Sequence, residues 1–492
     1  MGFTHHQGIR ALAVFAALGL MAGLAGCSTN PATGGDSFTA FMSPDQERQI
    51  GSQEHPKMVK EFGGNYDEKD LPRYVADIGA KLVAVSEAPT ENFTFTVLDT
   101  PVINAFALPG GYVYVTRGLM ALASNEAEIA GVLAHEIGHV VARHSAQRYS
   151  QGMLTQILAG GLSAAIGNGA GDIIGVGANA YLKSFSREHE FEADMLGVRY
   201  LTRAGYDPAG MASFLKKLRA HSRLQAKLAG RSPDEIDSFD FMATHPRTLD
   251  RIAQAQSAAN VQVVSNPTIG AVPYMTAIDG IIYGDGPDHG YARGNKFIHV
   301  PLDFYFEVPE EFSMVNQPDA VVARDGEGAM IVFEGAPGAK NIGLDQYLAT
   351  KFSNNIRLTN IEKIDINNQP AATGYADIRM KSGETARLRV VVIGRGDTAY
   401  QFLLIVPINR VDAYNVGLRR TTYSFRPLTA QEKQNYNPLR IKVRAVNPEY
   451  STATFVDSMA VEREAADVFA VLNGLEDNQQ PPAGSLVKTV VD

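Results

Sequence analysis

The run His135-Glu136-Ile137-Gly138-His139 combines two imidazoles and a carboxylate within one helical turn. In a helix, four residues at about 100° each return the second histidine to within roughly 40° of the first, so both imidazoles project from one face. Two imidazoles one turn apart can share a metal ion, and Glu136 lies beside them within reach of a water on that metal. The spacing therefore predicts a metal site on a helix, with a carboxylate placed to take a proton.

A second acidic pair, Glu190 and Asp194, stands four residues apart after Ser186, at the start of another expected helix. The two carboxylates share one face. Glu190 can complete a set of two histidines and one glutamate, while Asp194 accepts the distal N–H of a ligating histidine. Carboxylates in a first turn are also favoured by the helix dipole alone, so a solvated acidic helix start is the alternative. The histidine pair upstream favours metal binding.

The elements that position these motifs follow from periodicity. The run Ser43-Pro44-Asp45-Gln46 predicts a helix start with a capping box, and Ser124 is expected to cap the helix that carries the histidines. Helical spacing over 71–85 changes to alternation over 93–97, and Pro109-Gly110-Gly111 separates two further extended runs. Those runs are 102–108 and 112–115. A mostly helical domain with one small sheet is expected.

A glycine-rich apolar segment, 154–181, separates the two motifs. It is interpreted as a buried helical hairpin or a mobile flap rather than a membrane span, because Asn168 and Asp172 interrupt it. Helical patterns resume afterwards. They cover 186–204, 208–228 and 246–258.

The N-terminus has the pattern of an export signal, with Arg10 followed by a short apolar run over 11–24. Leu24-Ala25-Gly26-Cys27 resembles the lipobox of bacterial lipoproteins, which implies a signal peptide over 1–26 and acylation of Cys27. A secretory signal with an accidental cysteine is the alternative. Ser28 after the cysteine implies the outer membrane, with the protein facing the periplasm. Residues 27–42 are expected to form a tether, because they lack a hydrophobic period.

Four motifs occur in an order that resembles a known enzyme family. They are Asn104-Ala105-Phe106-Ala107-Leu108-Pro109-Gly110-Gly111, the histidine motif, Glu190-Phe191-Glu192-Ala193-Asp194, and Thr244-His245-Pro246 with Arg251. This set resembles the zinc metallopeptidases that include the type 1 CAAX prenyl proteases, HtpX and the periplasmic BepA-like enzymes, and it covers about 43–258. The resemblance implies a gluzincin-type domain over 43–260, in which His135, His139 and Glu190 bind one Zn²⁺. Glu136 would be the general base.

The same resemblance implies that His245 and Arg251 approach the metal from the opposite side. His245 would then stabilise the oxyanion of the tetrahedral intermediate, or occupy the fourth zinc position in a resting enzyme. A histidine that simply precedes a helix at Pro246 is the structural alternative.

Substrate is expected to bind along the strand 102–107, as an added strand held by backbone hydrogen bonds. Asn104 would act as a side-chain clamp, and Ala105 and Phe106 would contribute to the same edge. Recognition of this kind depends on backbone more than on sequence. It favours unfolded or loose segments.

Beyond a linker at 261–279, short alternating segments predict a β-rich α+β domain over 280–432. These segments are 304–308, 329–333, 388–392 and 401–406. Residues 437–492 are expected to form a strand, two helices and a strand, and resemble a LysM module, which implies peptidoglycan binding. Glu449-Tyr450-Ser451 stands where such modules usually have a Gly-Asp-Thr turn, so a purely structural role is the alternative.

Composition sets the remaining limits. The chain has 492 residues, with 45% hydrophobic and 20% charged residues, which is typical of globular proteins rather than disordered or multi-span membrane proteins. Its net charge of −9 is spread along the chain, which argues against nucleic-acid binding. The expected function is a lipid-anchored zinc endopeptidase that degrades misfolded or unfolded envelope polypeptides. The alternative is a periplasmic chaperone or assembly scaffold for outer-membrane proteins with a gated or closed zinc site.

Overall fold

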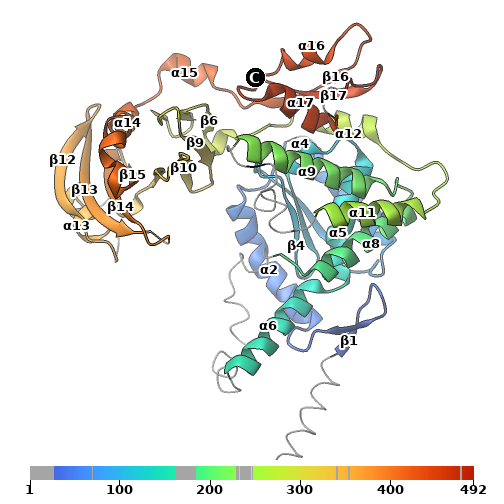
Figure 1. The fold of residues 1–492 in the computed structure, drawn as a ribbon. Helices are drawn as coiled ribbons and strands as arrows, with labels where there is room; N and C mark the ends of the chain where they lie inside the picture. Colours follow the sequence, from blue (N-terminus) through green and yellow to red (C-terminus); the bar gives the residue numbers. More distant parts are fainter. Residues whose placement is uncertain are drawn as a thin grey trace, which may run out of the picture. The chain divides into compact units, whose positions relative to one another are not determined.

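The computed structural model describes residues 27–68, 70–160, 184–228, 232, 245, 248–339, 342–352, 355–380, 382–476 and 479–492. They mix helices and sheets, which confirms the predicted α+β class (Figure 1). The chain divides into two compact units. Unit 1 contains the residues up to 281 together with 441–459 and 464–489, and unit 2 contains 282–440, 460–463 and 490–492. The expected signal peptide and most of the glycine-rich segment lie outside the described residues.

Unit 1 is mainly helical (Figure 1). Its helices up to residue 281 are α2 (Pro44–Glu61), α3 (Leu71–Ala84), α4 (Arg117–Leu122), α5 (Glu126–Val141), α6 (His144–Gly160), α8 (Arg187–Arg203), α9 (Gly210–Leu228), α11 (Thr248–Asn260) and α12 (Ala271–Ile278). Among the residues that the structure describes, no helix combines the length and apolar character needed to cross a membrane.

A small sheet lies beside these helices, with strand order β3 (Thr94–Leu98), β5 (Tyr112–Thr116), β4 (Ala105–Leu108). β3 pairs with β5 in parallel and β4 pairs with β5 in antiparallel orientation, so β4 is an edge of this sheet as described. Gly110 and Gly111 turn the chain between β4 and β5 at φ of 83° and 90°, in the left-handed region that favours glycine. The predicted turn between two extended runs is confirmed, although the first strand begins at Ala105 rather than at residue 102.

The helix starts show which local signals the chain uses. Ser43 forms the predicted capping box with Gln46 at the start of α2. The prediction for Ser124 is wrong, because Asn125 caps α5, its Oδ1 accepting from the Glu128 backbone N–H at 2.9 Å. The Ser124 hydroxyl instead accepts a hydrogen bond from Lys217. Tertiary contacts therefore decide between two neighbouring residues that both cap helices well.

Residues 27–42 contain regular structure, so the expectation of a structureless tether is wrong. β1 (Cys27–Thr29) and β2 (Asp36–Phe38) form an antiparallel hairpin. Between them, Asn30 and Ala32 are each 4% exposed, and the Asn30 side chain donates to Glu192 of α8 at 2.6 Å. Buried polar contacts, which composition does not reveal, order this segment.

The expected linker at 261–279 also has regular structure. It contains α12, on which Tyr274 is fully buried and donates to the Met120 carbonyl at 2.6 Å. Just before this helix, the Gly270 carbonyl accepts from the backbone N–H of Glu126 at the start of α5. This segment therefore packs as part of unit 1.

Unit 2 is the expected β-rich region. Its large sheet, as far as the structure describes it, has the order β12-β13-β14-β15-β11-β10-β9, and β6-β7-β8 form a second sheet. The strands are β6 (Tyr291–Arg293), β7 (Lys296–His299), β8 (Phe304–Glu307), β9 (Ser313–Asn316), β10 (Ala320–Arg324), β11 (Met330–Gly335), β12 (Thr359–Ile366), β13 (Gln369–Arg379), β14 (Thr385–Arg395) and β15 (Thr398–Pro407). The helices are α13 (Leu344–Thr350), α14 (Val411–Ser424) and α15 (Ala430–Asn435).

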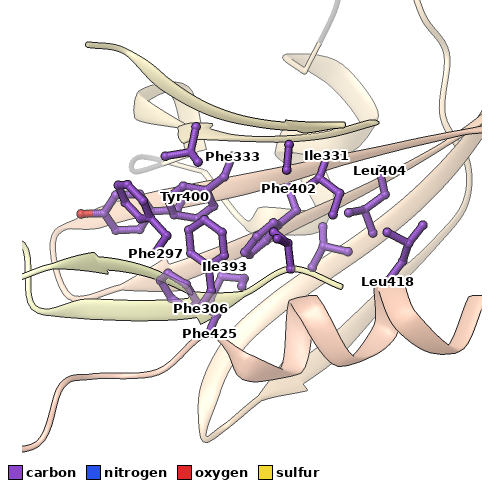
Figure 2. Packing of buried hydrophobic residues seen from close by; sticks show 14 of the residues in the cluster. Phe297, Phe306, Ile331, Phe333, Ile393, Tyr400, Phe402, Leu404, Leu418 and Phe425 are labelled. Atoms are coloured by element: carbon purple, nitrogen blue, oxygen red, sulfur yellow. The ribbon is translucent and has the colours of Figure 1, made fainter. Parts of the chain in front are cut away.

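Aromatic side chains form the main core of unit 2. Figure 2 shows Phe306 and Phe333 among side chains from both sheets, with Leu418 of α14 at the same core. The rings of Phe306 and Phe333 lie 4.7 Å apart, as do those of Phe333 and Phe402. Alternate residues of each strand enter this core. This explains why the strands could be predicted from alternation in the sequence.

The C-terminal segment has the expected order of strand, two helices and strand. These are β16 (Arg440–Ala445), α16 (Thr452–Val456), α17 (Ala465–Asn473) and β17 (Leu486–Val491). Most of it belongs to unit 1. Lys488 is fully buried, and its Nζ donates to the carbonyls of Ala121, Leu122 and Ala123 at 2.6 to 2.8 Å.

Candidate metal centre

The histidine motif lies on α5, as predicted. His135 and His139 are 2% and 3% exposed, and their Nε2 atoms are 3.0 Å apart. Gly138 lets α5 approach α8 closely, because a Cβ there would lie 3.2 to 3.3 Å from Leu196 and Ala193. The helix therefore buries both imidazoles and directs them to one point.

The helix α8 supplies the carboxylates. Ser186 caps this helix by accepting from the His189 N–H, and one turn later Glu190 reaches the two imidazoles. Its oxygens lie 3.6 Å from Nε2 of His135 and of His139. Asp194 is fully buried and lies 2.9 Å from Nδ1 of His135, the nitrogen that faces away from His139. Asp194 therefore holds the orientation of His135.

His245 and Arg251 complete the cluster, as expected. Nδ1 of His245 lies 3.0 Å from both oxygens of Glu190 and 3.4 Å from Nε2 of His135. Arg251 comes from α11, is 1% exposed, donates twice to Asp194 at 2.8 Å and contacts Glu190 at 2.9 Å. Thr244 and Pro246 of the expected motif lie outside the described residues.

This donor set fits a zinc ion. One ligand atom from each of His135, His139, Glu190 and His245 lies within 4.8 Å of the others. Tetrahedral zinc with ligand bonds of about 2.0 to 2.2 Å separates its ligand atoms by about 3.3 to 3.6 Å. The separations of 3.4 and 3.6 Å given above fall in that range, and the 3.0 Å between the two motif histidines is slightly shorter.

Burial and charge set the protonation of the cluster. Burial lowers the pKa of His139 well below its usual value, which keeps this imidazole neutral and its lone pair free. Burial opposes ionisation of Glu190, but the charges of His245 and Arg251 outweigh it and lower its pKa to about 2. For His245, the Glu190 carboxylate outweighs burial and raises the pKa. His139 is therefore held neutral and Glu190 ionised, which are the forms that bind metal, whereas His245 is favoured in its protonated form beside Glu190.

Glu136 differs from the other carboxylates. It is 1% exposed, and among the described residues no group donates a hydrogen bond to its Oε1. Nε2 of His245 lies 3.7 Å from the same oxygen. Burial raises the pKa of Glu136, which makes it a better proton acceptor than an exposed carboxylate.

Comparison with known proteins agrees with this geometry. The model of peptidase family M48 matches residues 70–259, which contain every residue of the cluster. This segment is a peptidase family M48 domain. The family and the set of ligands assign the domain to the zinc metallopeptidases.

Individual relatives share this domain. The chain is 34% identical over 253 residues to a beta-barrel assembly-enhancing protease of Yersinia pestis, covering 49% of this chain and 50% of that protein. For the protein of the same name in Escherichia coli (strain K12), identity is 31% over 236 residues, or 46% of each chain. The mitochondrial metalloendopeptidase OMA1 of Schizosaccharomyces pombe is 28% identical over 218 residues, covering 44% of this chain and 61% of that protein. The chain thus spans about half the length of the beta-barrel assembly-enhancing proteases it matches.

The M48 domain also contains residues to which the sequence assigned no role. His144 is fully buried, and its Nδ1 lies 2.8 Å from Nδ1 of His139. The ring of His189 stacks on His144 with centroids 4.3 Å apart. Phe185 stacks on His139 at 4.1 Å. The one sequence signal was a histidine five residues after the motif, and this spacing does not predict a contact on a continuous helix.

The expected substrate residues lie on a separate element of the M48 domain. Ala105 and Phe106 belong to the edge strand β4, but their side chains are 0% and 5% exposed, so only their backbone can serve an added strand. Asn104, just before β4, is 6% exposed, and no described group donates to its Oδ1. A small pocket lined by Leu108 of β4 and by His139 connects the strand to the metal cluster.

Proposed function

We propose that the M48 domain is a zinc-dependent endopeptidase for misfolded or unfolded polypeptides of the bacterial envelope. The observation that carries this is the buried set of His135, His139 and Glu190 beside Glu136, whose Oε1 accepts no hydrogen bond from a described group. A zinc ion in the set would polarise the scissile carbonyl and acidify the attacking water. A metal site that served structure alone would not need Glu136.

In this proposal Glu136, Asp194 and Arg251 have different roles. Glu136 takes the proton from the attacking water and then delivers it to the leaving amine. Asp194 orients His135, and Arg251 holds Asp194 and Glu190 ionised in a buried site. The preorganised charges lower the cost of the reaction because they need no rearrangement.

His245 acts in this proposal as a gate. One of its ring nitrogens belongs to the same close set as the ligand atoms of His135, His139 and Glu190, so in the resting domain it would fill the fourth position. Substrate would have to displace it. The rival role is oxyanion stabilisation. Faster proteolysis by His245→Ala supports the gate, whereas slower proteolysis with unchanged zinc content supports the rival, and wild-type rates exclude both.

Substrate would bind as a strand along β4, with its backbone N–H near Oδ1 of Asn104. Since such recognition needs an extended segment, unfolded chains would be cleaved faster than folded ones. The likeness to beta-barrel assembly-enhancing proteases supports outer-membrane proteins as the substrate class. An acyl chain on Cys27 would then hold the domain on the periplasmic face of the outer membrane.

The C-terminal segment has a structural role in this proposal. Lys488 and α17 face the helices of unit 1, and α17 packs against α4 and α9. Binding of purified peptidoglycan by the mature chain would instead favour the LysM interpretation.

The deciding experiment measures degradation of an unfolded model protein by the mature chain without Cys27. The controls are Glu136→Gln and a chelator-treated sample, together with the folded form of the same substrate. Cleavage by the untreated wild type alone, and faster for the unfolded form, supports the proposal. Zinc binding without any cleavage would favour an assembly scaffold with a closed site.

A further inference from the structure

His144 begins α6 and connects the metal cluster to the N-terminal hairpin. Its Nδ1 lies 2.8 Å from the nitrogen of His139 that faces away from the cluster. Its Nε2 lies 3.5 Å from Oε2 of Glu192, and the other oxygen of Glu192 accepts from Asn30 at 2.6 Å. These groups line up from His139 to the hairpin, with a hydrogen bond at each end and a 3.5 Å approach of His144 to the Glu192 carboxylate between them.

The donor and the acceptor in the contact between His139 and His144 can be assigned. Two ring nitrogens at 2.8 Å need one donor and one acceptor. Nε2 of His139 faces the cluster and offers its lone pair there, so a neutral His139 carries its proton on Nδ1 and donates to His144. The proton of His144 is then on Nε2, directed at Glu192. This pair of tautomers gives the His139–His144 contact one donor and one acceptor, while Nε2 of His144 lies 3.5 Å from Glu192 without a hydrogen bond to a described group.

Aromatic stacking also restrains the rings of His144 and His139. His189 stacks on His144 with an interplanar angle of 18°, and Phe185 stacks on His139 at 19°. Nε2 of His189 lies 3.3 Å from Oε1 of Gln147, which limits rotation of the stacked ring. Tilting the His144 ring toward or away from His139 would therefore break its contact with His139 or with His189.

The two histidines of the motif are supported by different groups. His135 meets the Asp194 carboxylate directly at 2.9 Å, and Arg251 neutralises that carboxylate. His139 meets the imidazole of His144, and the Glu192 carboxylate lies on the far side of that ring. A directly bonded carboxylate would add negative charge beside His139, whereas a histidine orients the ring without adding that charge.

We propose that His144 is a positioning residue for His139, and that Glu192 and Asn30 orient His144. The inference rests on the proposed metal role of His139. Through Asn30, the hairpin at Cys27–Phe38 would then help to orient the side chains of the metal site.

The test compares zinc affinity and the ligand field of the site in the full mature chain. We would measure zinc dissociation constants by competition with a chromogenic chelator, and record the visible spectrum of the cobalt-substituted protein. For His144→Leu we expect zinc affinity to fall about 10- to 100-fold, with a changed cobalt spectrum. For His144→Asn, whose side-chain oxygen can replace Nδ1 as acceptor, we expect recovery of most of the affinity. His299→Asn, at a buried histidine of unit 2, is the matched control.

The outcomes separate this inference from the proposed function. A wild type that binds no zinc refutes the metal role of His139. A wild type that binds zinc, beside a folded His144→Leu with equal affinity and an identical cobalt spectrum, refutes the positioning role. If His144→Leu does not fold, Glu192→Leu decides, because it removes the carboxylate that lies 3.5 Å from Nε2 of His144 at a partly exposed position. Reduced zinc affinity in that variant supports the positioning role, and unchanged affinity overturns it.

Discussion

Replacing Arg251 by methionine should destabilise the M48 domain strongly, and more in the absence of zinc. Methionine keeps much of the volume of the side chain but removes its charge. Arg251 is 1% exposed and holds two buried carboxylates, Asp194 and Glu190, at 2.8 and 2.9 Å. The variant leaves both carboxylates in a buried site without this cation.

The size of the effect can be estimated in two ways. Breaking a buried ion pair by removing one partner costs about 3 to 5 kcal/mol. Independently, the pKa of Glu190 falls from 4.5 to about 2, mainly through His245 and Arg251 acting against burial. A shift of that size corresponds to about 3 kcal/mol between the protonation states, and Arg251 shares it with His245. We therefore expect a loss of about 3 to 5 kcal/mol in the free energy of unfolding of the zinc-free protein. Bound zinc should reduce the loss, because its charge compensates Glu190.

The pH dependence provides an independent check. Glu190 has a lower pKa in the folded chain than in the unfolded chain, so its contribution to stability is complete above about pH 4.5 and is lost as the pH falls toward 2. Without Arg251, burial raises the pKa values of both carboxylates. The stability difference between wild type and variant should therefore be large at pH 7 and shrink below about pH 4.

Urea unfolding of the zinc-free and zinc-loaded proteins, repeated from pH 3 to 7, measures these quantities. Arg203→Met is the control, since Arg203 pairs with Glu87 at a half-exposed surface and should cost less than about 1 kcal/mol. Adding Asp194→Asn to Arg251→Met removes one of the unpaired charges and should recover part of the loss. A loss below 1 kcal/mol that does not vary with pH would refute the reasoning.

Three further predictions concern other parts of unit 1. Lys488→Met should lower the unfolding free energy by about 2 to 4 kcal/mol in a urea titration, because three buried carbonyls lose their shared donor; a change below 1 kcal/mol would show that water replaces it. Asn104→Leu should raise KM for an unfolded substrate. The unfolding free energy should change by less than about 1 kcal/mol, since Oδ1 has no described partner to lose. An unchanged KM would refute the role of Asn104 in substrate binding. Ser43→Ala should cost about 1 kcal/mol in thermal unfolding through loss of the capping box on α2, and a Gln46→Ala variant of equal cost would locate the effect in that box.

The helices of the metal site could be predicted because their signals are local. Spacing of four residues places His135 with His139, and Glu190 with Asp194, on single faces whatever surrounds them. The β-rich unit was readable for a similar reason, since alternation reports which residues enter its core. The packed structure around Asn30 and Tyr274 could not be predicted from the sequence. Each is held by one buried hydrogen bond to a distant residue, and a single polar contact leaves no periodic pattern in the sequence.

His144 shows most clearly where reading the sequence fails. On a continuous helix, five positions place it about 140° away from His139, so its spacing argues against contact. The chain instead ends α5 at Val141, and Arg143 adopts φ of 57°, which directs His144 back toward His139. Nothing local marks this turn, because left-handed backbone is expected at glycine or asparagine rather than arginine.

Contacts outside the family domain hold that turn. Arg143 donates to Glu47 at 2.8 Å, to the Met42 carbonyl at 2.8 Å and to Thr39 at 3.4 Å. All three partners precede residue 70, where the match to peptidase family M48 begins. Left-handed backbone at a side-chain-bearing residue costs about 1 to 2 kcal/mol, which these hydrogen bonds must offset. The geometry around His139 therefore depends on a segment that lies beside the hairpin starting at Cys27. If Cys27 carries the lipid, the elements nearest the membrane anchor are also those that support the second histidine of the candidate metal site.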